Sequence, residues 1–224
     1  MKRIVLSLAF IALFFPILAQ ETAYWHELTE EEQRPALEIK QRNVDNLVAA
    51  ALSIVDSTIV YDPSYVKIPY PMGDVPANTG VCTDVIIRAF RKGLDLDLQQ
   101  SIYEFRKWRK NECGQNDIVL DRSIDHRRVR NLMELFDFLA CQDSWKLNDC
   151  DGRYGRDLTK CEKGDIIVYD LGACGVLHIA ICISDKEMVH NIGGGQVIEP
   201  IYTDVPIIRN YRLWEPRKIE LRHK

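Results

Sequence analysis

Three side chains that can perform nucleophilic catalysis together occur in one order along the chain. Cys82 precedes an apolar run, and two histidines, His178 and His190, follow far downstream in short runs rich in isoleucine and valine. A thiol reacts as its thiolate, and a helix N-terminus or a nearby imidazolium lowers the thiol pKa from ~8.5 to roughly 3.5–7.5. We therefore predict that Cys82 is a nucleophile, that His178 is its base, and that His190 orients His178.

The two histidines can support each other only if they lie on one face of a β-hairpin. The turn-forming residues 184–187 separate the two runs. Because side chains alternate between the faces of a strand, His178 and His190 share a face only when the turn holds an odd number of residues. Such a turn would be centred near Ser184.

Each of these residues also has a structural interpretation. A single cysteine beside an apolar helix, or a single histidine in an apolar strand, is more often a core residue than a catalytic one. The combination of the cysteine with two neighbouring histidines favours catalysis. The remaining histidines have no such neighbour: His26, His126 and His223.

Charged residues flank the same segments. Asp84 lies in the first turn of the helix that Cys82 begins, where its carboxylate either caps the helix or lines a cleft. Arg127 and Arg128 follow Asp125 and His126. Either guanidinium could bind a substrate carboxylate through two hydrogen bonds. We favour the structural alternative, a charged helix start with Asp125 near the cap.

The apolar spacing predicts helices first and strands afterwards. Helical periods occur in residues 29–55, 83–92, 97–110 and 129–141, with Gly93 as a stop signal and a loop at 61–80. Short runs rich in isoleucine, valine and tyrosine follow at 165–169, 177–183, 188–192, 196–202 and 207–214. This order predicts the α+β class: N-terminal helices, with the nucleophile at a helix start, packed on an antiparallel sheet.

The N-terminus resembles a secretory signal. Lys2 and Arg3 precede an apolar run, and Ala19 is a small residue. The run is short for a membrane span, which needs ~20 residues. We expect 1–19 to be a signal peptide cleaved after Ala19, and 20–224 to be a single periplasmic or secreted domain without a membrane span. The formal net charge of −4 gives no electrostatic reason to bind nucleic acid, so we expect none.

The chain has 7 cysteines, so at least one thiol is unpaired in an oxidising compartment. If that thiol is Cys82, the others are available for disulfides: Cys113, Cys141, Cys150, Cys161, Cys174 and Cys182. Their pairing cannot be deduced from sequence, although Cys150 and Cys161 bracket a loop-like stretch and are weakly favoured. No Cys-x-x-Cys or His-x-x-x-His spacing occurs, so we expect neither a metal site nor a cofactor.

Several segments resemble the catalytic segments of NlpC-type cell-wall peptidases, which are papain-like cysteine hydrolases. The matching segments are 80–84, 163–166, 178–181 and 189–191. The resemblance implies a papain-like fold and a Cys82-His178-His190 triad. It also implies a place near the oxyanion site for Tyr70, because that family often has a tyrosine at this distance before the cysteine.

A closer resemblance covers nearly the whole chain beyond the signal. On its motifs the chain is identified as a member of a bacterial family of unknown function, domain of unknown function 1287. The motifs lie at 61–63, 70–76, 80–90, 124–129, 190–193 and 211–212. One departure from the NlpC-type pattern is that Val81 stands where those enzymes usually have aspartate, so their specificity for stem peptides is not implied.

These observations predict an exported cysteine hydrolase that cleaves an amide bond in peptidoglycan or a related peptide. Two alternatives remain open. A thioesterase or acyltransferase would use the same triad, because acyl transfer of any kind needs the same groups. A non-catalytic cell-wall-binding domain would retain the fold with an inert Cys82.

Overall fold

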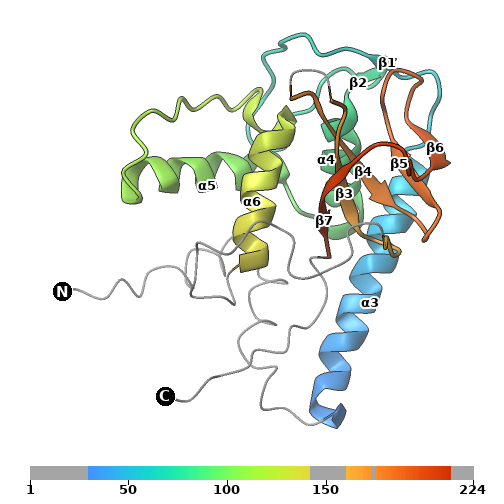
Figure 1. The fold of residues 1–224 in the computed structure, drawn as a ribbon. Coiled ribbons are helices and arrows are strands. Elements are labelled where there is room, and N and C mark those ends of the chain that lie inside the picture. Colours follow the sequence, from blue (N-terminus) through green and yellow to red (C-terminus); the bar gives the residue numbers. More distant parts are fainter. Residues whose placement is uncertain (1–29, 142–159, 173–174, 213–224) are drawn as a thin grey trace.

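The computed structural model describes residues 30–141, 160–172 and 175–212, and it is of the predicted α+β class (Figure 1). Its helices are α3 (Glu30–Ser53), α4 (Cys82–Leu94), α5 (Leu98–Glu112) and α6 (Val129–Cys141), with a short 3₁₀ helix, η1 (Asp125–Arg127). Its strands are β1 (Val60–Tyr61), β2 (Thr79–Gly80), β3 (Ile166–Asp170), β4 (Leu177–Cys182), β5 (Glu187–His190), β6 (Val197–Pro200) and β7 (Ile207–Tyr211). The predicted signal peptide lies outside the described residues.

The five strands that follow the helices form one antiparallel sheet, as predicted. Their order is β6-β5-β4-β3-β7, so β4 is central and β5 lies beside it. Each predicted strand is present, with ends that differ from the predicted ones by up to three residues.

The two faces of the sheet are covered by different parts of the chain. One face packs against the helices, where Ile179 and Ile181 of β4 join Val85 and Phe90 of α4 in the main core. The other face carries a smaller cluster, which is covered by the segment after β6. From that segment, the apolar side chains packed on the cluster are Ile201, Tyr202 and Val205.

Helix α4 continues past the predicted stop at Gly93 and ends at Leu94. The glycine serves close packing instead, because a Cβ at this position would lie 2.6 Å from the carbonyl oxygen of Asn46 in α3. The helix turns off one residue later at Asp95, which adopts the left-handed conformation with φ 55°. Gly93 thus lets α3 approach the helix that begins with Cys82.

The predicted loop at 61–80 contains a small element that the sequence pattern does not reveal. Its ends, β1 and β2, form a two-residue parallel pair in which Tyr61 lies opposite Gly80. In Figure 1 this pair lies at the end of the molecule where α4 begins. The pair therefore brings Tyr61 beside the residues that lead into Cys82.

The cysteines of the described residues are free thiols. Cys82, Cys161 and Cys182 are buried, and Cys113 is exposed. The favoured pairing of Cys150 with Cys161 is not found, since Cys161 instead packs beside Cys182 in the smaller cluster. Cys150 and Cys174, and the side chain of Cys141, lie outside the described part of the chain.

None of the helices in the described ranges is both long enough and apolar enough to cross a membrane.

His126 gives the fold a measurable dependence on pH. It is buried in η1, Nδ1 has no hydrogen-bond partner, and burial lowers its pKa from 6.5 to about 4. The unfolded chain binds a proton at this residue more readily, so its stabilising contribution is complete above pH 6.5 and is lost as the pH falls toward 4. The free energy of unfolding should fall by up to about 1.4 kcal/mol per pH unit for this residue.

Urea unfolding at pH 7, 6 and 5 tests this expectation, with His126→Gln as the matched variant. The variant should also lose stability on acidification, because His178 and His190 have lowered pKa values as well. The wild type should lose stability more steeply than the variant. Parallel curves for the two proteins would show that His126 is not held neutral in the fold.

Candidate active site

Cys82 is the first residue of α4, and its helix start is fixed by Asp84. The Asp84 carboxylate accepts a hydrogen bond from the Val81 backbone N–H at 2.7 Å, which is the capping role that we considered for it. The cysteine side chain is 5% exposed. The thiol is therefore held at a helix N-terminus, as predicted, but inside the protein.

The thiol meets β4 at a backbone amide that the sheet leaves unused. The ladder between β4 and β5 contains only the pairs Ile181–Val189 and Cys182–Met188. Alternate residues of a strand direct their N–H groups to the same neighbour, so the N–H of Ile179 points toward β5 as that of Ile181 does. Beyond the end of the ladder, this N–H donates to the Cys82 sulfur.

Burial dominates the electrostatics of the thiol. Burial raises the pKa of Cys82 to about 11, and the nearby Asp84 carboxylate acts in the same direction. Hydrogen bonds from the backbone N–H groups of Ile179, Thr83 and Cys82 itself lower the pKa, but by less. The sequence-based expectation of a lowered pKa is therefore wrong for this state of the protein. The desolvation of a thiolate outweighs the helix N-terminus because the sulfur has almost no contact with solvent.

The two histidines form the predicted pair. The centre of the hairpin lies at Asp185, one residue beyond the predicted position, and its register puts both histidines on the same face. Nε2 of His178 lies 2.8 Å from Nδ1 of His190. Burial lowers the pKa of His178 to about 3, with a further contribution from His190, and it also lowers the pKa of His190. Both rings are thus neutral at pH 7.

A third side chain extends this pair. Oε2 of Glu199 on β6 lies 3.2 Å from Nε2 of His190, within ion-pair distance although outside the angles of a good hydrogen bond. The Tyr202 hydroxyl donates to the same oxygen. Glu199 is not among the residues predicted from the sequence, although its alternation with His190 across adjacent strands was a usable signal.

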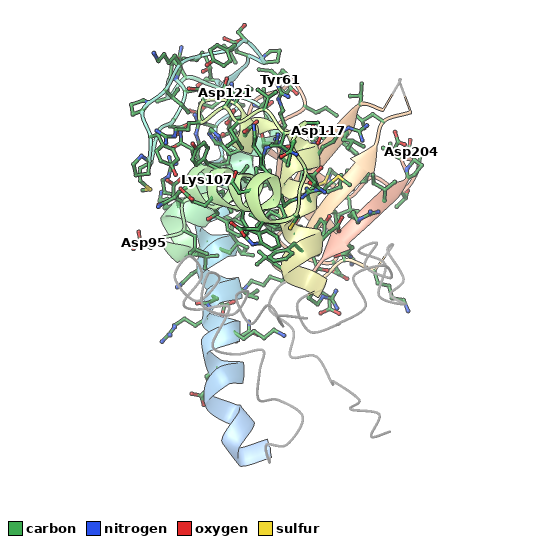
Figure 2. The ribbon with its side chains drawn as sticks, turned by 90° about the vertical axis from the view of Figure 1, so that its left-hand side faces the viewer. Tyr61, Asp95, Lys107, Asp117, Asp121 and Asp204 are labelled. Carbon is green, nitrogen blue, oxygen red and sulfur yellow. The ribbon has the colours of Figure 1, made fainter. Side chains whose placement is uncertain are left out.

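The tyrosine near the thiol is Tyr61 and not Tyr70. Burial, and then the nearby Cys82 thiol, raise the pKa of Tyr61 to about 12. The Tyr70 hydroxyl instead lies 3.3 Å from Glu104 of α5, and its ring packs against Tyr103. Figure 2 shows Tyr61 at one end of the molecule, close to Asp121 in that view.

Asp84 also forms a buried ion pair with Arg127. The Nε and Nη2 atoms of Arg127 lie 3.0 Å from Oδ1 and Oδ2 of Asp84, respectively. The same guanidinium donates to the backbone carbonyls of Asp62 and Ser64, just after Tyr61. Arg127 thus ties the helix that begins with Cys82 to the loop of Tyr61. Arg128 is exposed, and its side chain is available to a ligand.

In the described part of the chain, Cys82 and His178 are brought to neighbouring positions of β4 without a direct contact between them. Among the described residues no hydrogen bond joins the Cys82 thiol to His178, but Ile179, the sulfur's donor, is the next residue along β4. Nε2 of His178 is occupied by His190, and Nδ1 has no protein hydrogen-bond partner in the same part of the chain. Within these ranges no three histidine, cysteine or acidic side chains gather as metal ligands.

The high pKa of Cys82 predicts slow alkylation at neutral pH. The rate with iodoacetamide should rise about tenfold per pH unit, without a plateau below pH 10, because only the thiolate reacts. Mass spectrometry of labelled peptides at several pH values measures each cysteine separately, and the exposed Cys113 serves as the internal comparison. A plateau below pH 8 at Cys82 would indicate a preformed thiolate.

The described residues thus define an α+β protein in which a buried cysteine at a helix start lies against a strand that carries a paired histidine. The family model for a domain of unknown function, DUF1287, matches residues 48–213, and the chain belongs to this family. It is also 32% identical over 197 residues to the "Uncharacterized protein YijF" of Escherichia coli (strain K12). That match covers 84% of this chain and 90% of the relative.

Proposed function

We propose that the protein is a cysteine hydrolase of the papain-like, NlpC type that cleaves an amide bond, with peptidoglycan as its substrate. The observation that carries the proposal is the position of the Cys82 thiol at the start of α4, against the strand that bears His178 and its partner His190. The N-terminal run at 1–19 supports export to the compartment in which peptidoglycan lies.

In this reaction Cys82 attacks the carbonyl carbon of the amide, and His178 receives the thiol proton. The proton then passes to the leaving amine, and water releases the acyl group from the sulfur in a second step. The backbone N–H groups around the sulfur, together with the Tyr61 hydroxyl, are the donors available to stabilise the oxyanion.

The raised pKa of Cys82 bears on how the attack occurs. A thiolate formed in advance would be costly in this buried position, so the proton leaves the sulfur as the new bond forms. Nearby N–H groups stabilise the charge only as it develops, which is the condition under which such donors contribute most to catalysis.

Digestion of purified sacculi tests the proposal. Residues 20–224 are incubated with sacculi of several peptide chemotypes, and the released fragments are analysed by mass spectrometry. New fragments that depend on Cys82 would support the hydrolase, and the mass of their new termini would identify the bond cut. Unchanged fragment patterns with all chemotypes would argue against it.

One observation favours a second candidate, a domain that binds the cell wall without cleaving it. The Cys82 thiol is buried and weakly acidic, as an inert core cysteine would be. Slow alkylation alone cannot separate the two functions, because both predict it. Cosedimentation with sacculi does: equal binding by wild type and Cys82→Ala, with no fragments from either, would favour the binding domain.

A further inference from the structure

The carboxylate of Glu199 extends the contact between the two imidazole rings of the candidate site. His190 has two polar neighbours: Nδ1 lies 2.8 Å from Nε2 of His178, and Nε2 lies 3.2 Å from Oε2 of Glu199. The His190 side chain is fully buried, whereas that of Glu199 is partly exposed. Among the described residues, Nε2 of His190 has no hydrogen-bond partner of better geometry.

This chain of contacts determines where the protons lie. An ionised carboxylate can only accept hydrogen bonds, and a neutral imidazole has one N–H and one lone pair. Glu199 therefore favours the proton of His190 on Nε2, which leaves Nδ1 as an acceptor. Nε2 of His178 must then be the donor in the contact between the rings. By elimination, Nδ1 of His178 carries a lone pair.

The surrounding groups hold this chain in place. The Tyr202 hydroxyl donates to Glu199, and the Tyr202 backbone N–H donates to the Tyr169 hydroxyl at 3.1 Å. The Tyr169 ring stacks on His178 with its centroid 6.2 Å away. Tyr169 on β3 and Tyr202 just after β6 thus hold the Glu199 carboxylate and the His178 ring in fixed positions relative to each other.

We propose that Glu199 is a positioning residue that sets the tautomers of both histidines, so that His178 presents an unprotonated Nδ1 as the base for Cys82. This inference rests on the proposed cysteine hydrolase. In the step concerned the S–H bond breaks, its electron pair stays on sulfur, and the proton forms the new Nδ1–H bond of His178. With the opposite tautomers Nδ1 of His178 would carry a proton beforehand, and the only lone pair of that ring would lie on Nε2, which faces His190.

The tautomers can be measured without any substrate. In protein labelled with ¹⁵N-histidine, long-range ¹H–¹⁵N spectra at pH 7 distinguish a protonated from an unprotonated ring nitrogen, and His178→Gln and His190→Gln proteins assign the signals. We expect Nε2–H on both rings in the wild type. A wild-type signal from Nδ1–H on His178 would overturn the inference, whether or not the protein hydrolyses sacculi.

The variant Glu199→Leu removes the acceptor and excludes a replacing water. We expect a second population with Nδ1–H on His178 and, where sacculi are cleaved, a fall in kcat of about tenfold or more with little change in KM. The matched control is Glu187→Leu, because Glu187 lies exposed on β5 and, among the described residues, its side chain forms no hydrogen bond or ion pair with either ring. Glu199→Gln retains an acceptor oxygen and should restore most of the wild-type tautomer.

The outcomes separate the inference from the proposed function. The expected tautomers without hydrolysis of any sacculus would support the role of Glu199 and count against the hydrolase. Tautomers that are identical in wild type and Glu199→Leu would overturn the role of Glu199 even if both proteins were active.

Discussion

The variant Cys82→Ala is expected to release no fragments from sacculi that the wild type cleaves, a loss of at least about 10⁴-fold in rate. The loss follows because the proposed reaction forms its covalent intermediate on the Cys82 sulfur, and the neighbouring Thr83 hydroxyl donates to the Arg127 backbone carbonyl. Because the buried sulfur also accepts a hydrogen bond from the Ile179 N–H, its removal should lower the free energy of unfolding by about 1–3 kcal/mol. Fragment release and urea unfolding of the same preparations measure the two effects.

The partners of Cys82 give this prediction its internal checks. His178→Ala should be nearly as severe, and the double variant no worse than Cys82→Ala, because both changes disable one unit. His190→Ala should be milder, since it acts through His178. Cys113→Ala, at an exposed cysteine after α5, is the matched control and should retain full activity. Turnover by Cys82→Ala would show that the nucleophile is another residue.

The largest effect on stability is expected from Arg127→Met, at about 3–5 kcal/mol of unfolding free energy. The substitution leaves the Asp84 carboxylate buried without its partner, and both side chains of the pair are only 2% exposed. It also removes the donors to the carbonyls of Asp62 and Ser64. Urea unfolding at pH 7 and low salt measures the change.

Arg128→Met provides the control for this experiment, because it removes the same charge from the adjacent exposed position. Its unfolding free energy should stay within about 0.5 kcal/mol of the wild type. A loss below about 1 kcal/mol in Arg127→Met would mean that Asp84 finds another partner or takes up a proton. Combining Arg127→Met with Asp84→Asn should recover part of the loss, since the unpaired charge is then gone.

The parts of the fold that follow from local periodicity could be read from the sequence. The five strands after Gly164 and the helix that begins at Cys82 were predicted because apolar residues recur there at the spacing of each element. The pairing of His178 with His190 was also accessible, because parity along two neighbouring strands decides which side chains share a face.

The parts that were missed depend on contacts between distant segments. Tyr61 reaches Cys82 through a parallel pair of only two residues, which leaves no periodic signal. The partner of Arg127 is Asp84, 43 positions away, and nothing local links them. The pKa of Cys82 depends on how completely the sheet covers the sulfur, and burial of a single atom cannot be derived from residue spacing.

The short ladder between β4 and β5 makes the environment of the sulfur depend on the length of a hairpin. If the register of Ile181–Val189 continued, the next hydrogen-bonding pair would join Ile179 to Asn191, and the Ile179 amide would be consumed by the sheet. Instead, the sulfur takes the place of that carbonyl, and the Asn191 side chain reaches back to the Gly80 carbonyl at 3.4 Å. The β4–β5 ladder and the Cys82 sulfur therefore compete for one donor. A ladder longer by one hydrogen-bonded pair would leave the sulfur without the Ile179 N–H.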